Sequence, residues 1–133
     1  MKSIDVVAAI IVQDGKVLAT QRGHDDFVGG WEFPGGKIEQ GETPEEALVR
    51  EIHEELDATI AVDRLFTVVD YDYDAFHLHM RCFLSHVESG ALQLHEHSAA
   101  KWLDAATIDD VAWLPADIQV IEAIKEQVFG VRG

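Results

Sequence analysis

The chain has 133 residues, 47% hydrophobic and 26% charged, a balance that predicts one globular domain over residues 1–133 with a buried core. Its formal net charge of −15 argues against binding to DNA, RNA or another polyanion by electrostatics alone. A lone cysteine, Cys82, excludes an internal disulfide and favours a reducing, cytoplasmic location. The first apolar run, residues 6–12, is too short to span a membrane.

The first third of the chain predicts a hairpin and a loop. Residues 6–12 and 16–22 are β-prone runs separated by Gln-Asp-Gly at 13–15, which is typical of a tight hairpin turn. Residues 23–30 are rich in glycine and aspartate and predict a loop, which leads into Trp-Glu-Phe-Pro at 31–34.

A well-delimited helix is predicted over about residues 44–57. Thr43 and Glu46 have the spacing of a capping box, and Pro44 suits the first helical position. One face of this helix is apolar and can anchor it to a core through Leu48, Ile52 and Leu56.

The rest of the chain predicts further strands and a second helix. Strands are expected near residues 60–73 and 75–87, the second with an apolar face of alternating residues, namely Phe76, Leu78, Met80, Cys82 and Leu84. A turn at Ser89-Gly90 leads into residues 91–94, and residues 101–103 predict a short strand. Pro115 opens a C-terminal helix with three apolar residues expected to face inward, Ile118, Ile121 and Ile124. Mixed strands with two helices predict an α/β sandwich.

Three carboxylates form a stripe on the first helix. Glu51, Glu54 and Glu55 stand at positions i, i+3 and i+4 and span about 100° of one helix face. Such a stripe can simply be a solvated acidic surface. Here it follows a loop containing Gly35 and Gly36, whose bare backbone can come close to a ligand. Clustered carboxylates are what a hard divalent cation such as Mg²⁺ requires.

This stretch resembles the Nudix box over 23 residues, Gly36 to Ala58. All charged positions of the box match, namely Glu42, Arg50, Glu51, Glu54 and Glu55. The departures are Asp57, where glycine is usual, and Ala58, where a larger aliphatic residue is usual. Aspartate tolerates the left-handed conformation better than most residues, so Asp57 can still end the helix.

The resemblance implies the Nudix fold, a mixed β-sheet sandwiched between α-helices. Three stretches outside the box, residues 6–11, residues 77–79 with 94–97, and residues 114–118, resemble the MutT-like branch and, within it, the bacterial CTP pyrophosphohydrolase group. It implies a nucleoside triphosphate pyrophosphohydrolase that acts on CTP, dCTP or modified nucleotides. The alternative within this branch is an 8-oxo-dGTP diphosphatase. A Nudix module that has lost catalysis is a further alternative, although such proteins typically lose box carboxylates, which are intact here.

The resemblance also implies a metal site. The Gly35 carbonyl with Glu51, Glu54 and Glu55 is expected to hold Mg²⁺ or Mn²⁺ against the substrate phosphates. Glu96 matches a family position that supplies a loop carboxylate as an extra metal ligand or base; the alternative is a solvated loop residue.

Two box residues are assigned supporting chemistry. Glu51 is the favoured general base, with Glu96 as its rival. Arg50 is expected to pair with a box carboxylate and hold it in place, and the alternative is an ordinary surface ion pair.

Four residues are expected to contact the nucleotide. Arg22 matches a family arginine near the sugar and phosphates, and Glu32 and Phe33 lie beside the metal loop, where the Phe33 ring can pack on a base. Asp117 matches the position that reads the base edge. As an ionised acceptor it suits an amino group such as cytosine N4, but it can equally be a helix cap.

The histidines raise one more alternative. His77 and His79 are two residues apart, as are His95 and His97, so either pair could in principle bind zinc. The hard-oxygen site in the box favours Mg²⁺ instead, and His77 and His79 are expected on the cleft or on an exposed sheet face. The sequence leaves open whether the protein is a monomer or a homodimer.

Overall fold

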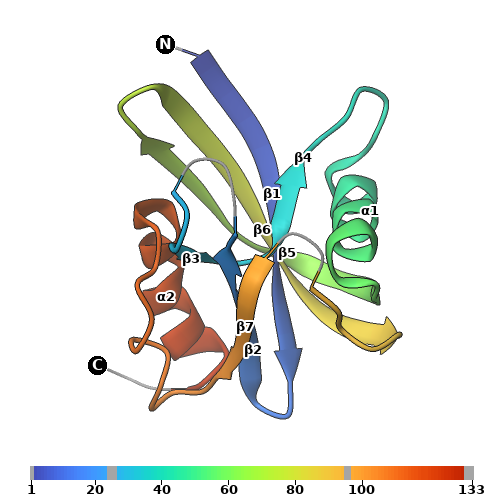
Figure 1. Ribbon diagram of the computed structural model, residues 1–133, viewed down its shortest axis with the longest axis vertical. Helices are drawn as coiled ribbons and strands as arrows, with labels where there is room; N and C mark the ends of the chain where they lie inside the picture. The colour runs from blue at the N-terminus through green and yellow to red at the C-terminus, as the bar shows by residue number, and fades with distance from the viewer. Residues whose placement is uncertain (1, 24–26, 95–96, 131–133) are drawn as a thin grey trace.

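The computed structural model describes residues 2–23, 27–94 and 97–130 (Figure 1). Within these residues the chain forms strands and helices in the order β1 (Lys2–Gln13), β2 (Lys16–Arg22), β3 (Trp31–Glu32), β4 (Gly35–Lys37), α1 (Pro44–Leu56), β5 (Thr59–Asp72), β6 (Phe76–Ser89), β7 (His97–Leu103) and α2 (Pro115–Gln127). No helix in this part of the chain is long and apolar enough to cross a membrane.

Strand β1 is the centre of a mixed sheet with the order β3-β2-β1-β6-β5, in which β4 also pairs with β1 and β7 with β2. It runs parallel to β6, from Lys2 opposite Phe76 to Ile11 opposite Ser85. It runs antiparallel to β4 and β2. The parallel pairing explains why β1 begins four residues before the apolar run that predicts it: β6 supplies hydrogen-bonding partners for a polar N-terminal segment.

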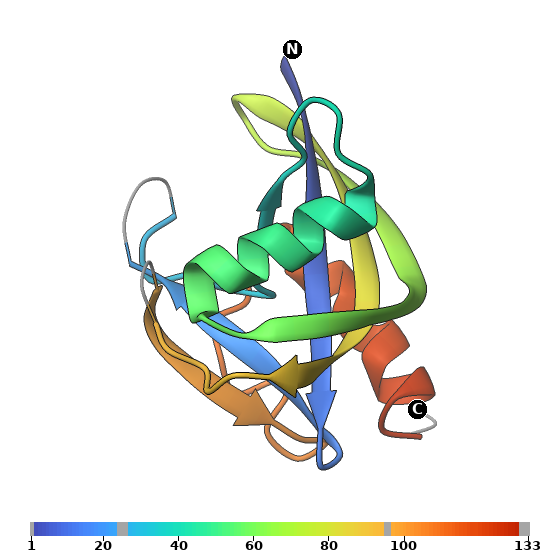
Figure 2. The ribbon, with the colours of Figure 1, turned by 90° about the vertical axis from the view of Figure 1, so that its right-hand side faces the viewer.

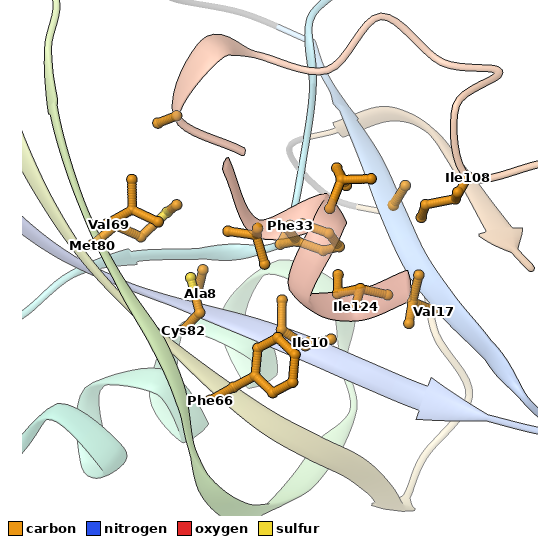
Figure 3. Close-up of a cluster of buried hydrophobic side chains, with 14 of the residues drawn as sticks. Ala8, Ile10, Val17, Phe33, Phe66, Val69, Met80, Cys82, Ile108 and Ile124 are labelled. Atoms are coloured by element: carbon orange, nitrogen blue, oxygen red, sulfur yellow. The ribbon is translucent and has the colours of Figure 1, made fainter. Parts of the chain in front are cut away.

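The two helices lie on opposite sides of this sheet (Figures 1 and 2). Alternate residues of β1 point to opposite faces, so Val7, Ala9 and Ile11 pack with α1. Ala8 and Ile10 belong to the second cluster, which includes residues of α2. Figure 3 shows part of this second cluster, including Phe33 and Ile124. The predicted α/β sandwich is confirmed.

Local signals set the ends of α1 as predicted. The Thr43 side chain accepts a hydrogen bond from the Glu46 N–H at 3.1 Å, and the Glu46 carboxylate accepts one from the Thr43 N–H at 2.9 Å. At the other end Asp57 adopts the left-handed conformation, with φ of 57°. The hairpin turn is also confirmed, because Asp14 and Gly15 both have positive φ between β1 and β2.

Helix α2 differs from its prediction on one face. Ile121 and Ile124 are buried, but Ile118 is 54% exposed. The buried stripe instead runs through Asp117, Val120, Ile121 and Ile124. A carboxyl group therefore takes the inward place in the first turn that the apolar pattern assigns to isoleucine.

Candidate active site

A cavity of about 860 Å³ brings together most of the residues that the sequence singles out. The predicted site residues that line it are Arg22, Glu32, Phe33, Gly35, Glu51, Glu55 and Asp117. Arg50 and Glu54 lie beside it without lining it. Glu96 and His95 lie outside the described residues. The cavity has an acidic end at α1 and an apolar end near the start of α2.

Glycine is required where β4 passes α1 at the acidic end. A Cβ atom on Gly36 would lie 2.4 to 2.7 Å from the carboxylate atoms of Glu51. A Cβ atom on Gly35 would lie 1.9 Å from the Val7 carbonyl oxygen. Any other residue would therefore push the Glu51 carboxylate away from β4 or separate β4 from β1. The glycines predict only a loop here, but because the segment can come this close to β1 it pairs with it and forms the short strand β4.

Arg50 organises the carboxylates around this end. Its guanidinium donates two hydrogen bonds to Glu42, at 2.7 and 2.9 Å, and one to Glu51 at 2.9 Å. A further bond to the Lys37 carbonyl oxygen, at 3.1 Å, links α1 to the end of β4. The hydrogen bonds that Arg50 donates to Glu42 hold the pKa of Arg50 above its ordinary value and lower the pKa of Glu42. Arg50 is thus the centre of an ion-pair network with three carboxylates of the box, Glu42, Glu51 and Glu54.

The three carboxylates of the stripe do not all face the cavity. Glu51 and Glu55 line it, and Glu55 is only 7% exposed. The Glu54 side chain is 58% exposed and accepts a hydrogen bond from Arg50 at 3.3 Å. Within the described parts of the chain, no group of three or more His, Cys, Asp or Glu side chains is arranged to hold a metal ion. Glu54 must turn if it is to join the other two on one ion.

The next part of the cavity carries a mixed charge cluster. Arg22 donates to Glu32 at 3.1 Å, joining the end of β2 to β3. The His97 Nε2 lies 3.5 Å from the same carboxylate, and its side chain is 7% exposed. The histidine spacing suggests His97 only as a zinc ligand, yet it lines the cavity beside Glu32. Its position follows from the pairing of β7 with β2, which places it opposite Arg22.

Asp117 is a buried carboxyl group at the apolar end. It is 4% exposed, and its Oδ1 accepts a hydrogen bond from the Phe33 N–H at 3.0 Å. Burial raises the pKa of Asp117 to about 8, opposed by the Phe33 bond and reinforced by the charge of Glu32. The acid is therefore largely protonated at pH 7. The expectation of a purely accepting carboxylate is corrected, because a neutral carboxyl group also donates.

The contacts of Asp117 also bear on the capping alternative. The N-cap position of α2 is Leu114, which makes no side-chain capping bond. Asp117 lies three residues further on and ties α2 to Phe33, so its side chain does not act as the N-cap of α2.

Phe33 itself is 3% exposed, and its ring stacks on Trp113 with centroids 4.6 Å apart. The ring thus has a protein partner, although Phe33 still lines the cavity.

Aromatic residues that the sequence does not assign to the site complete the apolar end. Phe27, Tyr73 and Phe76 line the cavity together with Leu78 and Met80. The alternation of β6 predicts an apolar face for Leu78 and Met80, but not that this face borders a ligand cavity. The aromatic cluster depends on the β5–β6 turn meeting the loop before β3, which no local pattern reveals.

His77 and His79 lie on the other face of β6, outside the cavity lining. His77 bonds Asp72 at 2.5 Å and Asp70 at 2.9 Å, and His79 bonds Asp70 at 2.8 Å. The Asp72 and Asp70 carboxylates raise the pKa of His77. Of the two expected locations, these histidines occupy the outward sheet face.

Comparisons with known proteins agree with this geometry. The NUDIX domain model matches residues 1–124. The CTP pyrophosphohydrolase of Escherichia coli K12 is 40% identical over 124 residues, which cover 92% of this chain and 92% of that protein. The 8-oxo-dGTP diphosphatase of the same strain is 32% identical over 127 residues, covering 94% and 98%. The solution structure of the E. coli ORF135 protein has a TM-score of 0.79 at 39% identity, covering 93% of this chain and 89% of that one.

The family match spans nearly the whole chain, and every charged position of the box is present on or beside α1. Gly35 and Gly36 of β4 and two carboxylates of α1, Glu51 and Glu55, border one cavity. The chain belongs to the Nudix hydrolase family.

Proposed function

We propose that the protein hydrolyses nucleoside triphosphates to nucleoside monophosphate and pyrophosphate, with CTP, dCTP or their oxidised or methylated derivatives as preferred substrates. The observation that carries this proposal is that the two ends of one cavity are lined by chemically different groups. Its α1 end presents carboxylates and glycine backbone, and its other end presents aromatic walls and the buried Asp117. A triphosphate bound to divalent metal ions fits the first end, and a nucleobase fits the second. The relative named CTP pyrophosphohydrolase supports the choice of base.

The donor set at the α1 end fits a hard divalent cation. Nudix hydrolases need a divalent metal, and we propose Mg²⁺ or Mn²⁺ held by the Gly35 carbonyl with Glu51, Glu54 and Glu55, and by Glu96. All these donors are oxygen atoms, which suit Mg²⁺ and Mn²⁺. The tight contact of Gly36 with Glu51 leaves no Cβ atom between the strand and the carboxylate. When bound, the ion offsets the charge of the phosphates and acidifies a water molecule.

The residues around this end position the reacting groups. Hydrolysis adds one water molecule across a phosphoanhydride bond, and a base must take a proton from that water. We assign this role to Glu51, which lines the cavity and is held by Arg50 at 2.9 Å. Glu96 remains the rival base. Arg50 keeps Glu51 in place, and Arg22 lies where it can contact the sugar or the phosphates.

Asp117 is assigned to the base edge. Its carboxyl group is held by the Phe33 N–H, which fixes its direction within the apolar end. Because it is largely neutral at pH 7, it can accept from an exocyclic amino group or donate to a carbonyl oxygen. Phe33 supports this carboxyl through its backbone, and its ring forms part of the cavity wall. Glu32 contributes through its pairing with Arg22.

The second candidate is an 8-oxo-dGTP diphosphatase. The relative of that name, which covers 94% of this chain, favours it. A neutral carboxyl at Asp117 is compatible with an oxidised purine as well, because such a base presents both amino and carbonyl groups. In either case we propose one domain in a reducing cytoplasm, consistent with the single, buried, free Cys82.

A substrate panel tests both candidates. Purified protein is incubated with CTP, dCTP, 5-methyl-dCTP, 8-oxo-dGTP and the unmodified triphosphates in Mg²⁺, and the products are separated by chromatography. Nucleoside monophosphate and pyrophosphate should form fastest from a cytidine substrate, and EDTA should abolish turnover. Faster turnover of 8-oxo-dGTP would select the second candidate. Release of orthophosphate, or turnover unaffected by EDTA, would contradict both.

A further inference from the structure

The apolar end of the cavity has a continuous aromatic wall centred on Tyr73. Its ring lies 5.0 Å from that of Phe27 and 5.2 Å from that of Phe76, measured between centroids. Phe27 has a positive φ of 63° and is 43% exposed. A left-handed conformation is unfavourable for a residue with a bulky side chain and persists where surrounding structure imposes it, commonly at ligand sites. The Gly30 N–H donates to the Phe27 carbonyl at 3.0 Å and helps to hold it.

Tyr73 also contacts the start of α2 directly. Its hydroxyl oxygen accepts a hydrogen bond from the Ala116 N–H at 3.2 Å. The next residue, Asp117, is held from another side by the Phe33 N–H at 3.0 Å. Two segments distant in sequence therefore pin the first turn of α2, and the side chains of Tyr73 and Asp117, which interact electrostatically, both line the cavity.

The Tyr73 hydroxyl retains a proton to donate. Burial raises the pKa of Tyr73 above its ordinary value, although the bond from the Ala116 N–H lowers it in part, so the phenol is neutral at pH 7. A phenol can accept one hydrogen bond and donate another. Among the described residues, the Ala116 N–H is the one hydrogen-bond partner of this hydroxyl, and it is a donor. The phenolic proton is left for a ligand in the cavity.

We propose that Tyr73 is a specificity-determining residue, whose hydroxyl donates a hydrogen bond to an acceptor on the base while its ring forms the wall beside that base. The inference rests on the proposed function, and it adds what Asp117 alone does not supply. A neutral carboxyl group can accept or donate, so by itself it distinguishes amino from carbonyl groups poorly. Tyr73 is directed toward donation by its bond from Ala116.

The pair has a preferred base edge. Cytosine presents an amino donor at N4 beside an acceptor at N3, and Tyr73 supplies the donor for N3 while Asp117 accepts from N4. Uracil presents the reverse order, an acceptor at O4 beside the N3–H donor. Tyr73 donation therefore favours the amino–ring-nitrogen edge and disfavours the uracil edge.

The test is a double-mutant thermodynamic cycle, in which the Tyr73 hydroxyl is removed from the protein and N3 is removed from the base, separately and together. The probes are cytidine 5′-(α,β-imido)triphosphate and its 3-deaza analogue, which replaces N3 by C–H, each titrated calorimetrically in Mg²⁺. Tyr73→Phe should lower the affinity for the cytidine probe by about five- to tenfold, the scale of one lost hydrogen bond. It should lower the affinity for the 3-deaza probe by less than about twofold. The matched control is Tyr71→Phe. Tyr71 packs on Tyr73 with centroids 4.8 Å apart, but its hydroxyl has no hydrogen bond within the described residues.

The outcomes separate the inference from the function. Equal weakening of both probes by Tyr73→Phe, or no weakening of either, would overturn the inference, even if the melting temperature falls. An equal effect of Tyr71→Phe on the ratio of the two probes would overturn it as well. Because the imido probes are not hydrolysed, the cycle does not depend on turnover. A wild-type protein that shows the expected cycle but hydrolyses no triphosphate would contradict only the hydrolase proposal.

Discussion

The two ends of the cavity differ in the charge and in the solvent exposure of the groups that they offer to a ligand. At the α1 end several charges lie close together, partly in contact with water, and Arg50 bonds three of the carboxylates. At the α2 end a single carboxyl group, Asp117, is 4% exposed, and burial raises its pKa to about 8. At the first end the Arg50 guanidinium is the counter-charge of these three carboxylates, whereas at the second end the exclusion of water favours the neutral form of Asp117. Phosphates accompanied by divalent cations suit the first environment, and an uncharged base suits the second.

Neutralising the α1 end should have the largest effect on activity. Glu51→Gln, Glu54→Gln and Glu55→Gln keep side-chain shape but remove charge, and each should lower kcat by about 100-fold or more. Steady-state kinetics in Mg²⁺ measures this, with Glu45→Gln on the exposed first turn of α1 as the control. Glu54 is the informative case because it faces Arg50 in this structure. A near-normal kcat for Glu54→Gln would mean that it does not turn toward the metal.

Loosening the same end should have a smaller effect. Arg50→Lys retains the positive charge but cannot bond Glu42, Glu51 and the Lys37 carbonyl together, because an ammonium lacks the planar fork of a guanidinium. We expect kcat to fall by about tenfold to a hundredfold through misplacement of Glu51. Arg64→Lys, an exposed arginine with bonds of 3.4 Å, is the matched control. Equal kinetics for the two variants would return Arg50 to the role of a surface ion pair.

At the α2 end, changing Asp117 should alter base preference more than phosphate chemistry. Asp117→Ala should lower kcat/KM for the preferred base by about 1–3 kcal/mol, the scale of a lost buried polar contact. Asp117→Asn retains a donor and an acceptor and should shift the ranking of bases instead. The measurement is kcat/KM across cytidine, uridine and guanosine triphosphates. An unchanged ranking with a lower melting temperature would make Asp117 a structural residue only.

The buried acid should also make stability depend on pH. About one pH unit or more below its ordinary pKa of 3.8, Asp117 is protonated in both the folded and the unfolded state. As the pH rises from its ordinary pKa of 3.8 to about 8, only the unfolded state loses the proton. Folding then requires proton uptake, so the wild type should lose stability relative to Asp117→Asn over this range, by at most about 1.4 kcal/mol per pH unit, and level off above pH 8. The free energy of unfolding of each protein is measured by urea denaturation over this pH range. A difference between the two proteins that stays constant with pH would refute the prediction.

The smallest effect is expected on the outer face of α2. Ile118→Ser changes a residue that is 54% exposed, and it should alter the free energy of unfolding by less than about 0.5 kcal/mol. Ile121→Ala, on the buried face, should cost about 2–5 kcal/mol. Chemical denaturation compares them directly. A large cost for Ile118→Ser would restore the inward face that the apolar pattern predicts.

The sequence by itself determined the features that act over a few residues. The capping box of Thr43 and Glu46 begins α1, Asp57 ends it, and the Asp14-Gly15 turn joins β1 to β2, all as predicted. These signals can be read from a sequence because the interacting groups lie within about one helical turn or one hairpin loop. The same holds for the glutamate stripe, whose shared helix face follows from helix periodicity. The match to the family box rests on this local pattern.

Only the tertiary structure decided what happens at the α2 end. The Asp117 carboxyl meets Phe33 across 84 residues of sequence, and the Tyr73 hydroxyl meets Ala116 across 43. The outward position of Ile118 and the raised pKa of Asp117 both follow from packing against distant strands. Burial depends on which segments fold over a residue, and desolvation depends on burial, so neither can be read from neighbours in the chain.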